Sequence, residues 1–273
     1  MSEVITIIKP KPTWRFIDYA EVWQYRELFW TFIMRDIKVR YKQTVLGGFW
    51  AILQPFATMV IFSVFFGQIA KIGSEGVPYP IFSYAGLILW IYFSNAITLA
   101  STSLVNSAGL INKIYFPRII LPMASSFTGV LDYFISGIVL VGLLFYFRIA
   151  LTPALLLLPL LVLFTWVLAS GIGFWLAAIN VKYRDVQYAI PFFIQLMLFF
   201  TPVIYPTSVA PNYKLLLALN PMSGIIEAHR AIILQNKPIN FESLLISIGI
   251  TVVIYVFGAL YFRSVEKYFT DII

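Results

Sequence analysis

The feature that most constrains this sequence is a run of about 28 residues without a charge, between Lys42 and Lys71. A helix rises 1.5 Å per residue, so about 20 apolar residues cross the roughly 30 Å of hydrocarbon in a bilayer. The run is therefore long enough to be a membrane span. Arg35, Lys38, Arg40 and Lys42 stand directly before it. Because Lys and Arg beside a first span usually set its orientation, we expect this preceding segment to lie in the cytoplasm.

Composition extends this expectation to the whole chain. The sequence is 60% hydrophobic and 11% charged, with a mean hydropathy of +0.88, whereas soluble domains carry about 25% charged residues. This indicates a polytopic membrane protein. The formal net charge of +7 is explained by an excess of basic residues in cytoplasmic loops, so we do not expect a nucleic-acid partner.

The predicted fold is an all-α polytopic membrane protein with six transmembrane helices, an N-terminal amphipathic interfacial helix, and re-entrant helices before the last span. Residues 1–44 form the predicted N-terminal cytoplasmic segment with the interfacial helix, residues 45–262 the transmembrane domain, and residues 263–273 a cytoplasmic tail. The predicted spans are 45–70, 82–107, 123–147, 154–180, 188–205 and 241–262. Residues 206–238 are interrupted by prolines and charges, and apolar pieces this short favour re-entrant or interfacial helices.

Six spans place both termini on one side of the membrane. With the termini inside, 14 of the 19 Lys and Arg residues fall on the cytoplasmic side. This bias predicts a multi-pass protein of the cytoplasmic (inner) membrane with both termini in the cytoplasm.

Several kinds of chemistry are excluded by residue type. The chain has no cysteine and a single histidine, so we expect no disulfide, no thiolate site and no metal-binding residues. No phosphate-binding loop of the form GxxxxGK[ST] occurs, so the chain cannot hold a nucleotide in that way. We therefore expect no catalytic residue and no cofactor in this chain. A pump built from it needs ATP and Mg in a separate ATPase.

Two short loops, at residues 112–122 and 181–187, have the composition of a protein contact. Aromatic residues and Arg dominate binding hot spots, and both loops combine aromatic with charged side chains. The candidate contacts for an ATPase subunit are Tyr115, Phe116, Arg118, Tyr183, Arg184 and Asp185. The alternative is that the basic residues only determine topology, and the residues alone favour neither explanation.

Charged residues within apolar surroundings form a second group. Asp132 is the only carboxylate away from the ends of a predicted span, and such groups usually face protein or water. It is a candidate gate, or else a buried acid that fixes helix packing. Glu227, His229 and Arg230 could form a second gate cluster, although a lone histidine is more often structural.

Four segments resemble a known family. KIYFPRIILP (113–122), RYKQTVLGGFWAILQP (40–55), NVKYRDVQ (180–187) and LNPMSGIIEAHRAII (219–233) are similar to the motifs of type 2 ATP-binding-cassette exporter permeases of polysaccharides. The resemblance extends in particular to the permeases of O-antigen and teichoic-acid exporters. It implies a homodimer of six-span subunits, two separate nucleotide-binding ATPase subunits, and a prenol-diphosphate-linked glycan as cargo.

Aromatic residues are frequent on the first and fifth predicted spans, which line the conduit in this family. Aromatic faces can stack on sugar rings, although aromatic residues also face lipid or neighbouring helices. The candidate pathway residues are Phe62, Phe66, Phe199 and Tyr205. The candidate contacts for the lipid phosphates are Arg35, Lys38, Arg40 and Lys42.

Other functions remain open from the residues. An ion-coupled secondary transporter would normally show more intramembrane charges and an internal repeat. A membrane-embedded transferase would need more acids or metal ligands than this sequence has. An exporter of another amphipathic cargo would share most of the features above.

Overall fold

The computed structural model describes residues 19–42, 44, 47–209 and 214–269. The first part of the predicted N-terminal segment, the start of the predicted first span and the end of the tail lie outside these residues. The described part of the chain is helical, without strands. Its elements are α1 (Tyr19–Gln24), α2 (Arg26–Tyr41), α3 (Phe49–Phe62), η1 (Ser63–Ile69), α4 (Tyr79–Asn106), α5 (Ala108–Ile111), α6 (Ile120–Thr128), α7 (Val130–Tyr146), η2 (Pro153–Leu157), α8 (Leu158–Lys182), α9 (Val186–Phe200), η3 (Thr207–Val209), α10 (Lys214–Leu219), α11 (Pro221–Leu234), α12 (Phe241–Val265) and η5 (Glu266–Tyr268).

Five helical segments are long and apolar enough to cross a membrane. They are Phe49–Ile69, Tyr79–Asn106, Ile120–Tyr146, Pro153–Lys182 and Phe241–Tyr268. The helix α9 has only 15 residues, which at 1.5 Å per residue is shorter than the hydrocarbon core. The chain is thus a multi-pass membrane protein.

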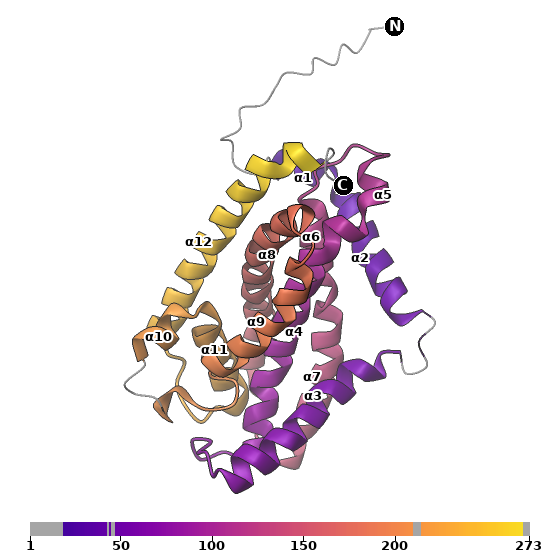
Figure 1. Ribbon diagram of the computed structural model, residues 1–273. Helices are drawn as coiled ribbons and strands as arrows, with labels where there is room; N and C mark the ends of the chain where they lie inside the picture. The colour runs from indigo at the N-terminus through magenta and orange to yellow at the C-terminus, as the bar shows by residue number, and fades with distance from the viewer. Residues whose placement is uncertain (1–18, 43, 45–46, 210–213, 270–273) are drawn as a thin grey trace, which may run out of the picture.

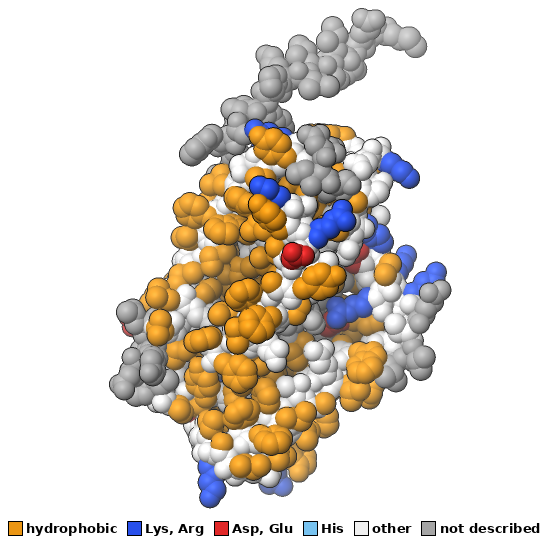
Figure 2. Space-filling model, in the orientation of Figure 1, with side chains coloured by type: hydrophobic (Ala, Val, Ile, Leu, Met, Phe, Trp, Pro, Cys, Tyr) orange, Lys and Arg blue, Asp and Glu red, His pale blue; other side chains and the backbone are white. Residues whose placement is uncertain are grey.

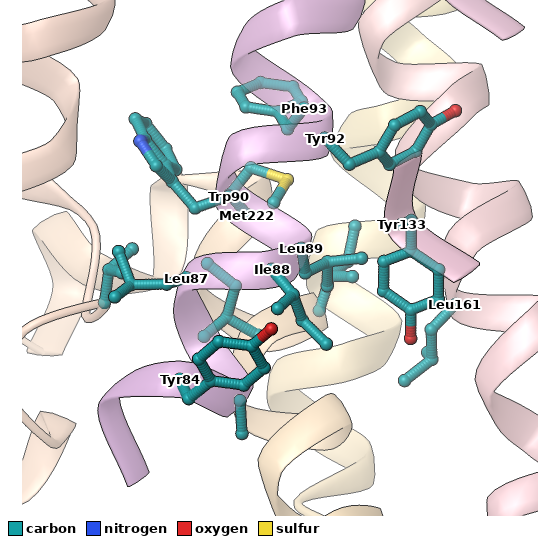
Figure 3. Packing of buried hydrophobic residues seen from close by; sticks show 14 of the residues in the cluster. Tyr84, Leu87, Ile88, Leu89, Trp90, Tyr92, Phe93, Tyr133, Leu161 and Met222 are labelled. Carbon is teal, nitrogen blue, oxygen red and sulfur yellow. The ribbon is translucent and has the colours of Figure 1, made fainter. Parts of the chain in front are cut away.

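The helix α4 forms the centre of the bundle (Figure 1) and contacts α3, α6, α7, α8, α9 and α11. Most of its side chains are buried, because neighbours cover it on several faces. Figure 3 shows Tyr84 and Trp90 of α4 among the buried hydrophobic residues, with Tyr133 of α7 and Met222 of α11 nearby. Through α4, helices from the first and the second half of the sequence share one hydrophobic core.

Small residues let α8 pack closely against its neighbours. A Cβ atom added to Gly171 would lie 2.7 Å from the Cα of Tyr255 in α12, and one added to Gly173 would lie 2.5 Å from Cβ of Ala100 in α4. Close backbone approach at small residues is a main source of helix association in membranes. These glycines therefore fix the spacing of α4, α8 and α12.

The N-terminal helix differs from a simple surface anchor. The apolar residues of this predicted amphipathic helix are partly covered by protein, because α2 packs against α6 and buries Phe32 and Ile33. Trp23 and Trp30 remain exposed. The structure also breaks the predicted helix between α1 and α2, at Tyr25.

Basic side chains gather toward the ends of the molecule, while apolar side chains cover its middle. Figure 2 shows this distribution on one face. In Figure 1, α1, α5 and the end of α12 lie at one end of the bundle, and the connection from η1 to α4 lies at the other. Such a band is typical of a surface that contacts lipid.

Candidate functional site

One end of the bundle gathers the loops predicted to contact another protein. The turn between α5 and α6 lies against η5, because the backbone N–H of Arg118 donates to Glu266 Oε1 (3.1 Å) and its guanidinium donates to the Glu266 carbonyl (2.5 Å). The turn between α8 and α9 lies nearby, since Lys182 and Tyr183 line a pocket of about 300 Å³ together with Tyr268. We call residues 107–119, 182–186 and 263–269 the basic end.

The predicted contact residues differ in exposure. Tyr115 is 77% exposed and its hydroxyl donates to Glu21 Oε1 (3.3 Å). Tyr183, Arg184 and Asp185 are also exposed. Phe116, in contrast, is only 4% exposed, and its ring lies 5.5 Å from that of Phe32 in α2. The side chain of Phe116 therefore holds the loop to the bundle and is not presented at the surface.

The four candidate residues for the lipid phosphates, on the last turns of α2 and directly after it, divide into two pairs. Arg35 forms an ion pair with Asp36 (2.8 Å), and Arg40 forms one with Asp132 of α7 (2.8 Å). Lys38 and Lys42 are exposed, and they form no ion pair with any described residue. Of the four candidates for lipid phosphates, only these two lysines extend without an acidic partner among the described residues.

Asp132 links two distant parts of the chain. Besides the ion pair with Arg40, its carboxylate accepts a hydrogen bond from the Tyr41 hydroxyl. Burial and the adjacent carboxylate raise the pKa of the Tyr41 hydroxyl above its ordinary value, so this hydroxyl remains a donor. One turn further along α7, Ser136 donates to the Ala51 carbonyl of α3 (2.6 Å). The end of α2 and the start of α3 are thus both attached to α7.

A polar pocket of about 220 Å³ lies beside this attachment. Its wall combines the ion pair with amide and aromatic side chains. The lining includes Arg40, Tyr41, Trp50, Gln54, Tyr92, Asn95 and Asp132. This agrees with the rule that a charge within a membrane domain faces protein or a polar cavity.

The three candidate gate residues on α11 have different hydrogen-bond partners. The Glu227 carboxylate accepts a hydrogen bond from Thr207, and His229 Nε2 lies 2.7 Å from the Tyr133 hydroxyl of α7. Arg230 is 5% exposed and donates to backbone carbonyls of Phe82 and Pro202. Each side chain therefore connects α11 to a different element.

The four candidate pathway residues form two pairs. The rings of Phe62 and Phe66 lie 5.4 Å apart in a T-shaped arrangement. The Tyr205 hydroxyl donates to the Phe199 carbonyl (2.9 Å), and both residues line an apolar pocket of about 840 Å³ between α4, α8, α9, α10 and α12.

Tyr79 connects the neighbourhoods of these pairs. A Cβ atom on Gly67 of η1 would lie 3.0 Å from its ring, and its hydroxyl donates to the Ile204 carbonyl (2.7 Å). Sequence reasoning did not single out Tyr79, Phe82 or Tyr41, because their partners lie more than 90 residues away along the chain. Two family-like segments were the available signals, since 219–233 contains Arg230 and 40–55 contains Tyr41.

These features define a polytopic membrane protein whose polar side chains join helices and line pockets. No three acidic or histidine side chains within the described ranges are placed to hold a metal ion. The chain belongs to the ABC-2 type transporter family, which its residues 27–234 match.

Named relatives align with almost the whole chain. The chain is 28% identical over 255 residues to the O-antigen export system permease protein RfbA of Myxococcus xanthus, covering 92% of this chain and 97% of that one. It is 25% identical over 243 residues to a protein of the same name from Klebsiella pneumoniae, covering 88% and 92%. It is also 25% identical over 243 residues to the polysialic acid transport protein KpsM of Escherichia coli, covering 86% and 92%.

Proposed function

We propose that this chain is the permease subunit of an ATP-driven exporter that moves a lipid-linked, O-antigen-like or teichoic-acid-like polysaccharide across the cytoplasmic membrane. The observation that carries this proposal is the end-to-end similarity to permeases named for O-antigen export and polysialic acid transport. The permease itself is not catalytic. Transport then requires contacts that hold an ATPase and a path that suits a glycan.

The basic end is the proposed docking surface for an ATPase subunit. A dimer of this chain would hold two such subunits, which bind ATP and Mg. Tyr115, Tyr183 and Arg184 are exposed there, and aromatic and Arg side chains are enriched in binding hot spots. Arg118 is tied to Glu266, so a push on the 107–119 loop would reach the C-terminal end of α12. This arrangement supports mechanical coupling between ATP hydrolysis and the helices.

For the topology, we propose six crossings with both termini in the cytoplasm. Five of these crossings are the long apolar segments. The remaining one, fifth in chain order, is α9 together with the turn that follows it, and η3, α10 and α11 form the re-entrant region. The basic end then faces the cytoplasm, in agreement with the excess of Lys and Arg in the loops assigned there.

The proposed assembly is a homodimer that encloses the conduit. The helices α3 and α9, with η1 between α3 and α4, expose large aromatic side chains, among them Trp50, Phe65, Phe192 and Phe199. A hydrophilic glycan cannot cross hydrocarbon unaided, so a path walled by protein is needed. Exposed aromatic faces from two copies could supply weak, sequence-tolerant stacking contacts along it, in the way that aromatic residues do for single-stranded nucleic acids.

The lipid's phosphates would first meet Lys38 and Lys42, which extend from the end of α2 before the entry into α3. Arg35 and Arg40 could join them by exchanging an intramolecular carboxylate for a phosphate, since guanidinium groups bind both anions in the same bidentate manner.

Reconstitution tests the proposal. The chain is co-purified with a candidate ATPase subunit and placed in vesicles with a short prenol-diphosphate-linked glycan. We expect ATP-dependent movement of the glycan to the opposite leaflet, and no movement with an ATPase that cannot hydrolyse ATP. Transport driven by a proton or sodium gradient without the ATPase would identify an ion-coupled transporter instead.

A further inference from the structure

The turn between α9 and η3 is irregular backbone in the interior of the protein. Residues 201–204 are buried, and they follow the last helical residue of α9 directly. Buried carbonyl groups outside a helix need other donors, and within a membrane domain water does not readily supply them. The partners of this turn therefore decide whether it holds one conformation.

Arg230 of α11 supplies several of these donors. Its guanidinium donates to the carbonyls of Pro202 (2.5 Å) and Val203, and to that of Phe82 in α4 (3.1 Å). Its Cζ atom lies 3.8 Å from the centre of the Phe82 ring. Within the described residues no carboxylate lies at ion-pair distance from it. The charge of Arg230 is therefore directed at the turn and not at an acid.

The sequence of α4 leaves room for this guanidinium. A Cβ atom on Gly86 would lie 2.5 Å from Nη2 of Arg230 and 3.0 Å from its Cζ. The absence of a side chain at position 86 is thus what allows Arg230 to reach both Phe82 and the turn. Gly86 and Arg230 act as one unit.

Two neighbours hold the same turn from either side. The Tyr79 hydroxyl donates to the Ile204 carbonyl (2.7 Å), and the Asn220 amide donates to Thr201 Oγ1 (2.8 Å). Tyr205 comes next in the chain and is bonded back to Phe199. The position of this aromatic pair at the 840 Å³ pocket therefore depends on the turn.

We infer that Arg230 is a positioning residue, which fixes the turn and thereby presents Tyr205 and Phe199 to the saccharide rings of the cargo. The identity of the cargo rests on the proposed function. The contacts of Arg230 with the carbonyls of residues 202 and 203, which we call the clamp, do not. Arg230 is too deeply buried to touch the glycan and acts through the backbone of residues 202 and 203. Lys cannot replace it, because a single ammonium lacks the planar fork that serves several carbonyls at once.

Cysteine labelling tests the clamp without any transport. The chain has no cysteine, so Tyr205→Cys introduces a unique reporter for a water-soluble maleimide. We expect labelling to be several-fold faster when Arg230→Lys or Gly86→Ala is added. Gly137→Ala on α7, where an added Cβ meets nothing within 4 Å, should leave the rate unchanged. Equal rates in all four chains would overturn the clamp.

A second arm separates positioning from mere stability, with Tyr205 intact. In the reconstituted complex, Arg230→Lys and Gly86→Ala should each raise the KM for the glycan several-fold. If only kcat falls, and by the same factor as the yield of folded protein, then Arg230 contributes to stability alone. The double variant should be no worse than Arg230→Lys, because the methyl group added at position 86 then has no guanidinium to displace. A wild-type complex that exports no glycan would refute the proposed function, and the labelling rates would still decide the clamp.

Discussion

At the scale of single residues, Asp132 shows how a charge can be kept inside a membrane domain. Its carboxylate is 11% exposed and is paired with Arg40 (2.8 Å) and with the Tyr41 hydroxyl. Breaking a buried ion pair costs about 3–5 kcal/mol, whereas exposed pairs contribute about 0–1 kcal/mol. Because Arg40 is 36% exposed, this pair lies between the two limits. Its structural effect is to attach the end of α2 to α7.

Replacing Asp132 tests this attachment. We expect Asp132→Asn to lower the free energy of unfolding by about 2 kcal/mol, since the Arg40 charge loses its partner. Arg40→Gln in the Asp132→Asn background should add less than it does alone, with a coupling of about 1 kcal/mol. Thermal unfolding in detergent measures both, with the exposed Arg148→Gln as control. Strictly additive effects would show that the two residues do not interact in solution.

Phe116 and Tyr115 are adjacent aromatic residues with opposite environments, so they offer a matched pair. Phe116→Ala should destabilise the protein by about 3–5 kcal/mol, because it empties a packed site against Phe32. Tyr115→Ala should leave the membrane abundance unchanged and reduce the yield of ATPase in co-purification. If both variants fold normally and retain the ATPase equally well, the basic end is not the docking surface.

At the scale of elements, hydropathy and charge placed most helices to within a few residues. The span predicted at 82–107 corresponds to α4 (Tyr79–Asn106), and that at 241–262 to all but the last turn of α12 (Phe241–Val265). The prediction for 188–205 differs, because the helix ends at Phe200. Pro202 disfavours a helical conformation at Thr201, where the backbone is extended. Beyond it, the carbonyls of residues 202–204 are bound by Arg230 and Tyr79. Such long-range donors cannot be read from local pattern.

Candidate site residues were harder to place for the same reason. Their types were recognisable in the sequence, but their partners were not. Glu227, His229 and Arg230 lie within four residues of one another, yet they bind Thr207, Tyr133 and the backbone near Pro202 respectively. On a helix, adjacent residues such as His229 and Arg230 point in different directions, and Glu227, one turn before Arg230, reaches Thr207 instead. A cluster in the sequence therefore became three separate links between elements.

The contact between α8 and α12 depends on glycine at both helices. A Cβ atom on Gly258 would collide with the Gly171 carbonyl and lie 2.8 Å from Cδ1 of Trp175. We expect Gly258→Ala to separate the helices and to destabilise the protein by about 1–3 kcal/mol. Gly142→Ala, where an added Cβ has no neighbour within 4 Å, should be neutral. Equal melting temperatures for the two variants would mean that this contact is loose in the membrane.

At the scale of the whole molecule, the connections sort to two ends. At one end, Arg118 and Glu266 join the α5–α6 turn to η5. At the other, Glu75 accepts from Lys237 (2.5 Å) and Ser208 (2.7 Å), so the η1–α4 connection meets the loops on either side of α10 and α11. A rigid displacement of α12 would therefore act on the Arg118–Glu266 contact at one end and on the Glu75–Lys237 contact at the other.

The absolute orientation can be measured directly on this cysteine-free chain. We expect Lys113→Cys and Arg184→Cys to be protected from an impermeant maleimide in intact cells, and Lys71→Cys and Arg148→Cys to be labelled. All four positions are exposed, so protection reports sidedness rather than burial. Labelling of position 113 or 184 from outside would show that these loops face outward, which contradicts the proposed topology.

The aromatic residues of the proposed conduit can be tested one at a time. If aromatic faces of α3, η1 and α9 guide the glycan, each contact should be weak enough to release the sugar, as multi-site conduction requires. Base stacking on aromatic side chains contributes about 1–3 kcal/mol per unit, and sugar stacking should be weaker. We therefore expect Phe62→Ala, Phe66→Ala, Phe199→Ala and Tyr205→Ala each to slow export by severalfold, without loss of membrane abundance.

Two matched controls make this test decisive. Leu160 and Leu163 on α8 are 47% and 45% exposed, close to the 55% of Phe199. An alanine there removes exposed apolar surface from a part of α8 that does not line the pocket of Phe199 and Tyr205. Export should be unaffected in these variants, and glycan-free ATP hydrolysis should match the wild type in both controls. Phe62 and Phe66 pack on each other, so the double alanine variant should reduce the export rate by less than the product of the two single reductions. For Phe62→Ala combined with Phe199→Ala, the two reductions in export rate should multiply. Wild-type export in all four aromatic variants, with losses only in the α8 controls, would place the conduit on another face of the bundle.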